Sequence, residues 1–115
     1  TDIYLVVEVM PEFPNGLKAL FDFIYDNLKY PSDAIEKGIQ GRVTVGVVID
    51  ENGSVTQPKI LKSISSSLDK EALRIVSIMP KWKPGTQDGV PVKVKCTFPV
   101  IFKLPNNDDL KTDSL

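Results

Sequence analysis

The feature of this sequence that most constrains the fold is a long alternating run near the C-terminal end, PVKVKCTFPVIFKL, at Pro91–Leu104. Apolar side chains fill every second position of the run, and mostly polar or charged side chains stand between them. Alternation over this length is typical of a β-strand that buries one face. The predicted inner set is Val92, Val94, Cys96, Phe98, Val100, Phe102 and Leu104, and the outer set is Lys93, Lys95, Thr97, Pro99, Ile101 and Lys103.

A proline inside this strand predicts which side of the strand is open. Proline has no backbone N–H and cannot donate to a sheet ladder. Residues two apart direct their backbone groups toward the same neighbouring strand, so Pro99 shares its side with Lys95 and Thr97. We therefore expect the even-numbered residues to bond to the sheet and the odd-numbered residues to face no permanent partner. Proline and lysine protect such an edge against aggregation, or the edge accepts an extended peptide.

Two further periodic stretches predict helices. Residues 17–28 place apolar side chains at the spacing of one helix face, and Asn15 before them is a candidate N-cap. Residues 68–79 show the same spacing, with Ser67 as the candidate cap and a proline directly after the stretch. Both stretches are long enough to cross one face of a small sheet.

A β-hairpin is predicted between these helices. Valines alternate in GRVTVGVVID, Asn52-Gly53 is a strong signal for a two-residue turn, and a return strand follows it. Pro58 lies in the return strand, so we expect that strand at a sheet edge or with a bulge. Before the hairpin, one or two helical turns are predicted, with Ser32 as their candidate cap and Gly38 as the residue that closes them.

Together these elements predict an α+β fold with the order helix, short helix, strand, strand, helix, strand. Two helices cover one face of a three-stranded antiparallel sheet, and both outer strands are edges. If the crossover through the second long helix skips one position, the last strand lies beside the first hairpin strand and antiparallel to it. The predicted core contains Leu20, Ile24, Val43, Val45, Val47, Ala72, Val76, Phe98 and Val100.

The 115-residue chain is long enough for one core and too short for two. We expect a domain at 10–104, preceded by a linker or an extra strand at 1–9. The stretch at 105–115 is polar and acidic without periodicity, which predicts a disordered tail. Because the chain begins with Thr1 rather than Met, we expect it to be a piece of a longer protein whose anchor lies upstream.

Composition argues against several classes of function. The net charge of −1 gives no global attraction to nucleic acid or to an anionic membrane, and Trp82 between two lysines is weak evidence for base stacking. The chain has no histidine, which is the commonest catalytic base and metal ligand. Cys96 is the only cysteine and lies on the apolar face, so it is predicted to be a small buried hydrophobe. We expect no enzyme, no metal and no cofactor.

Four stretches carry a resemblance to a known family: MPEFPNG, YPSDAIEKGIQGRVTVGVVIDENGSV, SLDKEALRIV and PKWKPGTQDGVPVKVKCTFPVIFKL. In this order, from about Met10 to Leu104, the sequence resembles the C-terminal domain of TonB energy transducers in the form common in Bacteroidota. Two departures stand out. Asn52 precedes Gly53 where aspartate is expected, and the chain continues past the final strand.

The resemblance implies a periplasmic domain that an upstream helix anchors in the inner membrane and couples to the ExbB–ExbD proton channel. It implies binding to the TonB box of outer-membrane TonB-dependent transporters, which take up siderophores or other nutrients. The box peptide would pair with the last strand, here Val92–Phe102, so the edge marked by Pro99 is an edge in use. Tyr30-Pro31 matches the family motif before the hairpin. Pairing of two copies through the same edge is left open.

A second hypothesis assigns a different function to the same kind of domain. TonB-like domains also occur at the ends of membrane-bound sensor peptidases resembling BlaR, where they act as interaction or sensing modules. One membrane helix and a proline-rich linker upstream of this chain favour energy transduction. Several membrane helices with a zinc-protease motif favour sensing.

Overall fold

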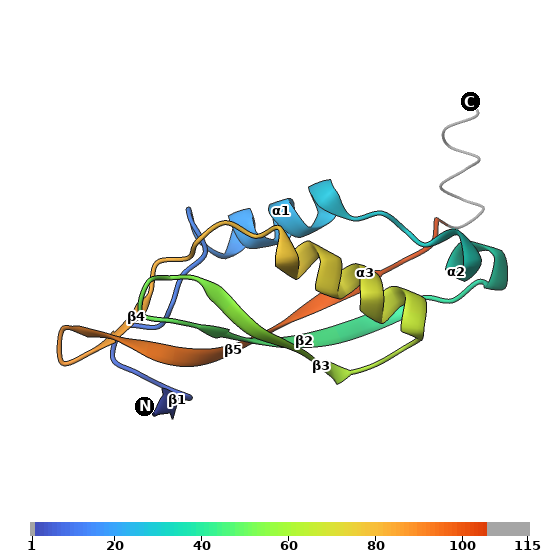
Figure 1. Cartoon of the computed structure of the whole chain (residues 1–115). Coiled ribbons are helices and arrows are strands. Elements are labelled where there is room, and N and C mark those ends of the chain that lie inside the picture. Colours follow the sequence, from blue (N-terminus) through green and yellow to red (C-terminus); the bar gives the residue numbers. More distant parts are fainter. Residues whose placement is uncertain (1, 106–115) are drawn as a thin grey trace.

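The computed structural model describes residues 2–105, which form three helices and five strands (Figure 1). The strands are β1 Ile3–Tyr4, β2 Gly41–Ile49, β3 Val55–Lys62, β4 Gly85–Gln87 and β5 Val90–Phe102. The helices are α1 Leu17–Asn27, α2 Ser32–Lys37 and α3 Ser66–Ser77. Apart from Pro105, the predicted tail lies outside the described residues.

The central sheet is the one that the sequence predicts. β2 lies between β5 and β3 and is antiparallel to both. The pairing of β2 with β5 runs without interruption from Gly41 opposite Phe102 to Ile49 opposite Val94. The α+β class and the place of the last strand beside the first hairpin strand are therefore confirmed.

Two short strands raise the count above the predicted three. β1 runs parallel to β5 on the side opposite to β2, and β4 pairs antiparallel with the first residues of β5. A two-residue turn joins β4 to β5, with positive φ at Asp88 (54°) and Gly89 (77°), as such hairpin turns require. β1 lies within 1–9, where the sequence predicts a linker or an extra strand, whereas β4 is not predicted, because a strand of three residues carries no measurable periodicity.

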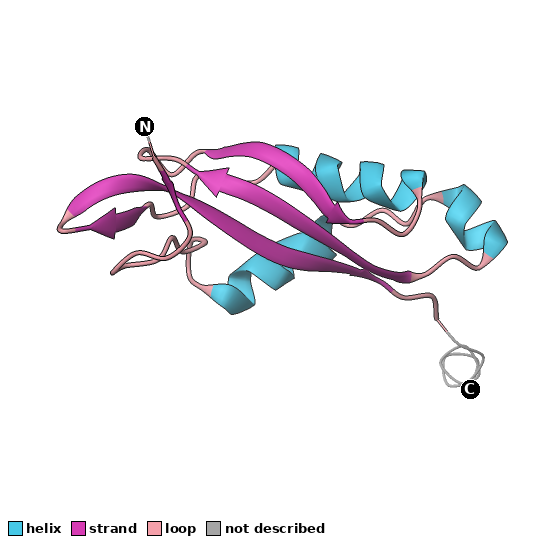
Figure 2. Ribbon diagram, turned by 90° about the horizontal axis from the view of Figure 1, so that it is seen from below, coloured by secondary structure: helices cyan, strands magenta, loops and turns pink. Residues whose placement is uncertain are grey.

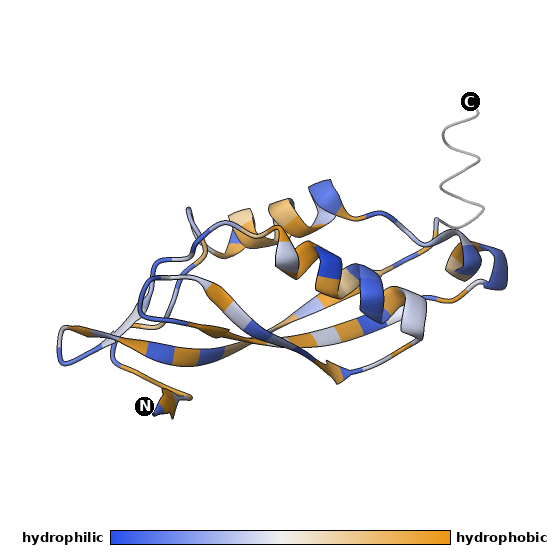
Figure 3. Cartoon of the chain, viewed as in Figure 1, coloured by the Kyte–Doolittle hydropathy of each residue, from blue (hydrophilic) through white to orange (hydrophobic). Residues whose placement is uncertain are grey.

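The helices cover one face of the sheet, as predicted. Figure 1 shows α1 and α3 side by side above the strands, and in Figure 2, seen from below, no helix of the described residues covers the opposite face. Along β5 hydrophobic and hydrophilic residues alternate (Figure 3). All nine predicted core residues are buried in one cluster. This cluster also contains Phe13, Ala34, Ile49, Leu68, Ile75, Trp82 and Phe102.

Three predicted helix caps are displaced from the observed ones, among them Ser32, because the N-cap of α2 is Pro31. The N-cap of α1 is Gly16 rather than Asn15, and no side chain of residues 2–105 caps the helix. The N-cap of α3 is Ser65 rather than Ser67, and its hydroxyl accepts from the N–H of Leu68 at 3.3 Å. A run of serines offers several equivalent caps, so composition alone does not select one. The left-handed C-cap predicted at Gly38 is confirmed, with φ 67°.

The irregularity expected in the return strand is present. β3 is an edge of the sheet, and its register against β2 shifts between Gly46 and Val48. Gln57, directly before Pro58, has a positive φ of 49°, and the shift in register lies at this point. The prediction of an edge strand with a bulge is therefore confirmed.

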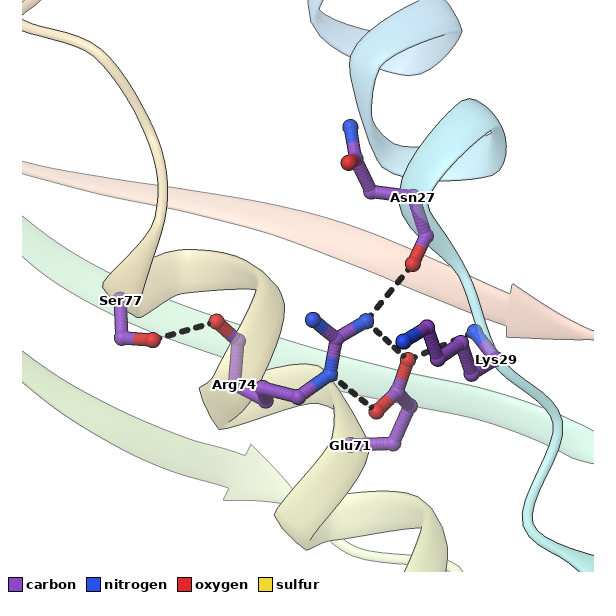
Figure 4. A network of polar contacts seen from close by, with 5 residues as sticks. All are labelled: Asn27, Lys29, Glu71, Arg74 and Ser77. Atoms are coloured by element: carbon purple, nitrogen blue, oxygen red, sulfur yellow. Dashed lines mark hydrogen bonds and ion pairs between the residues drawn. The ribbon is translucent and has the colours of Figure 1, made fainter.

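A buried carboxylate joins the C-terminal end of α1 to α3 (Figure 4). Glu71 on α3 accepts hydrogen bonds from the Arg74 guanidinium at 2.7 and 2.8 Å and from the backbone N–H of Lys29 at 2.7 Å. Arg74 also donates to the carbonyl of Asn27 at 2.7 Å, at the end of α1 where helix carbonyls lack partners. Burial of Glu71 raises its pKa, but the bonds from Arg74 and Lys29 and their charges lower it by more, so the net pKa lies below the ordinary value.

Replacing this carboxylate should destabilise the domain in a way that depends on pH. Because the folded-state pKa is depressed, the stabilisation is complete at neutral pH and disappears as the pH falls through the unfolded-state value of about 4.3 toward the folded one. We expect Glu71→Gln to lower the free energy of unfolding by about 1–3 kcal/mol at neutral pH and by less at acid pH. Urea denaturation at both pH values measures this.

The exposed ion pair between Lys18 and Asp22 on α1 provides a control for that substitution. Asp22→Asn removes the same charge at the surface and should leave the denaturation midpoint unchanged. An equal loss of stability for Glu71→Gln at acid and neutral pH would contradict the role of the buried charge.

The burial pattern of α1 gives a test of the core. Ile24 is fully buried, whereas Leu17 on the same helix is 70% exposed. Ile24→Ala should lower the free energy of unfolding by roughly 2–5 kcal/mol, because it removes buried methylene groups and leaves a cavity. Leu17→Ala should change it by less than about 0.5 kcal/mol. Equal denaturation midpoints for the two variants would show that α1 packs through another face.

Candidate partner-binding edge

The two sides of β5 have different partners. The backbone N–H of Ile101 donates to the hydroxyl of Tyr25 on α1 at 3.2 Å, so position 101 faces away from β2. Pro99, two residues earlier, points its nitrogen to the same outer side. The missing donor of Pro99 therefore leaves the ladder with β2 intact. Pro99 therefore lies on the outer side, as predicted, but the expectation that the odd-numbered residues face no partner is wrong at Ile101, which bonds to Tyr25.

Side-chain burial along β5 follows the predicted alternation. Val94, Phe98, Val100 and Phe102 are buried, and the last three belong to the core cluster that the helices cover. Lys95, Thr97 and Ile101 are exposed, while Val92, Lys93, Cys96 and Pro99 are half-buried. The buried residues all belong to the predicted inner set and the exposed ones to the outer set, but the half-buried residues come from both sets, and Cys96 is half-buried where the sequence predicts a buried side chain.

Part of the outer side is occupied by the chain itself. β1 pairs in parallel with β5, Ile3 opposite Lys93 and Tyr4 opposite Val94, and lies below β5 in Figure 1. Within residues 2–105, no strand pairs with the outer side of β5 beyond Val94. The open part of the edge is therefore shorter than Val92–Phe102, the range expected to accept a peptide.

An apolar groove of about 510 Å³ lies beside this open part. One wall is β5 from Lys95 to Pro99, and the other walls are α1 and the segment that follows β1. The exposed apolar side chains of Leu5 and Leu17 line the groove, and neither is a buried core residue. The lining residues are Leu5, Met10, Pro11, Leu17, Leu20, Phe21, Trp82, Lys95, Cys96, Thr97, Phe98 and Pro99.

The segment that forms one wall of the groove is fixed by hydrogen bonds to the β4 region. Val9 and Thr86 exchange backbone bonds of 2.8 and 3.1 Å, and Glu12 does the same with Lys83 at 2.8 and 3.0 Å. The carboxylate of Glu8 accepts from the N–H of Asp88 at 2.6 Å. These bonds hold residues 8–12 in place, so the groove has a defined shape without a partner.

The Tyr30-Pro31 motif lies elsewhere and has a packing role. The Tyr30 hydroxyl donates to the carbonyl of Ile39 at 2.5 Å, and its ring meets Phe102 edge-on at 5.5 Å. Pro31 precedes α2, and its carbonyl accepts from the N–H of Ile35. The motif therefore supports the C-terminal end of β5 and does not line the groove.

Sequence reasoning missed the groove and the contact between Tyr25 and Ile101. The apolar run at Ile3–Val9 predicts an additional strand, but nothing in the sequence shows that this strand pairs with β5. Nothing marks Tyr25 either, because it fits an ordinary amphipathic helix. These features depend on which distant segments the fold brings together.

Cys96 provides a natural reporter in the groove. Its side chain is half-buried, and burial raises the pKa of the thiol above the ordinary value. We expect maleimide to label Cys96 about tenfold or more slower than free cysteine at the same pH, because less thiolate is present and access is restricted. Unfolding in urea should restore the rate of free cysteine. Labelling of the folded protein at that rate would contradict the half-buried position.

The described residues offer little for other kinds of site. In this part of the chain, no group of three His, Cys, Asp or Glu residues could hold a metal ion. No helix among the same residues has the length and apolar character needed to span a bilayer. The edge of β5 and its groove are therefore the strongest candidate site.

Residues 26–104 match the family described as Gram-negative bacterial TonB protein C-terminal. The match covers more than half of the chain, and the chain belongs to this family.

The TonB protein of Vibrio cholerae is 34% identical to this chain in an alignment 79 residues long, and the alignment covers 66% of this chain and 31% of the Vibrio protein. The chain thus spans less than a third of the length of that relative.

Two solved structures of TonB C-terminal domains resemble the fold. The Pseudomonas aeruginosa domain has a TM-score of 0.54 and 28% identity, covering 69% of this chain and 80% of the solved one. The Helicobacter pylori domain has a TM-score of 0.52 and 25% identity, covering 75% of this chain and 79% of the solved one. These likenesses agree with the family assignment.

Proposed function

We propose that this chain is the periplasmic C-terminal domain of a TonB-type energy transducer. The family membership and the resemblance to solved TonB C-terminal domains support this class. In this proposal, an upstream part of the protein crosses the inner membrane and joins the ExbB–ExbD channel. The domain then passes energy from the proton gradient to outer-membrane transporters for siderophores or other nutrients.

We further propose that the TonB box of a transporter binds by adding a strand to the outer side of β5, within Val92–Phe102. The observation that carries this proposal is the open outer side beyond Val94, which no strand of residues 2–105 covers and which borders an apolar groove. Backbone bonds to an edge strand give affinity that depends little on side chains. The groove would receive alternate side chains of the added strand and supply selectivity.

The charge around the edge favours a particular kind of peptide. Five lysines lie between positions 81 and 103, and Asp88 is the only acidic residue in that stretch. Lys95 lines the groove and makes no ion pair with another described residue. A box segment with acidic flanks would therefore be steered to this edge, and its association rate should fall as salt is added.

A backbone substitution tests strand addition directly. Thr97→Pro removes an N–H on the outer side of β5 and leaves the ladder with β2 unchanged, because Pro99 on the same side is already tolerated. We expect it to weaken binding of TonB-box peptides about tenfold or more. Thr97→Val is the matched control, since it keeps the N–H and the side-chain shape and should bind like the parent.

Binding can be followed in two ways. Trp82 is the only tryptophan and lines the groove, so its fluorescence should respond to a bound peptide. Backbone amide shifts of Lys95 and Thr97 should move most in heteronuclear NMR, and far-UV circular dichroism shows that the variants are folded. Equal affinity of Thr97→Pro and Thr97→Val, or shifts confined to α2 and α3, would contradict strand addition.

A further inference from the structure

The outer side of β5 ends in two places, and each end is made by a different part of the chain. β1 pairs with Lys93 and Val94 at one end, and the hydroxyl of Tyr25 accepts the N–H of Ile101 at the other. We infer that β1 and Tyr25 are end stops that confine an added partner strand to Lys95–Pro99. This inference rests on the proposed function and specifies the length of the partner: about five extended residues, or roughly 16 Å.

The first end stop is held by more than its own pairing. β1 is only two residues long, and both side chains are exposed. Directly after it, however, Val7 is buried, and the N–H of Glu8 donates to the side-chain oxygen of Gln87 at 3.1 Å. The backbone of Val9 is then fixed to Thr86. This tether keeps β1 next to Lys93, so a partner strand that continued past Lys95 would have to displace it.

The second end stop is a side chain in the place of a strand. An edge residue normally leaves its N–H to water or to an added strand. Here Tyr25 uses the N–H of Ile101, and its ring stacks on Phe21 with centroids 6.4 Å apart and planes 14° from parallel. Tyr25 is 41% exposed, so core packing does not require its hydroxyl. Phenylalanine at this position would keep the stacking and release the N–H.

The groove occupies the same interval as the open edge. Its β5 wall runs from Lys95 to Pro99 and stops before Ile101. Leu5, which follows β1 directly, and Phe21, which stacks on Tyr25, are both lining residues. The groove, which has room for side chains, and the unpaired stretch of the β5 backbone thus end at the same two places, although different atoms form them. This coincidence supports a recognition site of fixed length.

Tyr25→Phe tests the second end stop in the full chain. In the free protein, the amide of Ile101 should exchange with solvent about fivefold or more faster, since it loses its acceptor. Thr56→Val is the control: it removes a hydroxyl that donates to the carbonyl of Val48, between β3 and β2, and should leave the exchange of Ile101 unchanged. Tyr4→Pro tests the first end stop differently: proline removes a donor from β1 and should unpair it from β5, so the amide of Lys93 should then exchange faster.

A nested series of TonB-box peptides of five, seven and nine residues tests the consequence for binding. For the parent, affinity should stop rising beyond five paired residues. In Tyr25→Phe the affinity should rise again, about fivefold, when the peptide is extended beside Ile101. In Tyr4→Pro the affinity should rise again when the peptide is extended beside Lys93. The amides of Ile101 and Lys93 should shift only in the respective variant.

The outcomes separate this inference from the proposed function. If peptides shift the amides of Lys95 and Thr97 but affinity grows equally with length in the parent and in both variants, strand addition stands and the end stops are wrong. Unchanged exchange of Ile101 in Tyr25→Phe also overturns the second end stop. If no peptide of any length shifts β5 in any variant, the proposed function fails, and the length rule fails with it.

Discussion

The uninterrupted ladder between β2 and β5 is the constraint on which the rest of the structure depends. Its register sends one set of β5 side chains under the helices and turns the backbone groups of the other set outward. Pro99 can stand in the middle of the strand only because this register gives it the outer side. A slip by one residue would bring the missing donor into the ladder and expose the core face. Core, groove and open edge therefore share one cause.

Much of this arrangement could be predicted from the sequence. Strong periodicity identified the two long helices, the hairpin and β5, and it also gave the buried sets, because burial requires a matching spacing of apolar residues. Pro58 and Pro99 added information that periodicity lacks, since a residue without an N–H can occupy only certain places in a sheet. One proline marked a bulged edge, and the other marked the open side of the central pair.

The remaining features could not be predicted, for physical reasons. β1 and β4 pair through two and three residues, and so short a strand is set by what lies beside it rather than by its own pattern. The groove needs segments at 5–11, 17–21 and 95–99 to meet, and no local property of any one of them requires this meeting. The contact from Ile101 to Tyr25 depends on the height of α1 above the sheet, which the packing of the whole core determines.

The attachment of β1 has a mechanical consequence. A pull on the N-terminal end of the chain would act on β1 first. The two-residue pairing between β1 and β5 would then lose its hydrogen bonds one at a time. The nine pairs between β2 and β5, loaded along the strands, would share the same force among them. Moderate tension would therefore strip β1 back to the bonds around Glu8 and leave the rest of the domain folded. The domain would respond to being pulled by lengthening its own open edge.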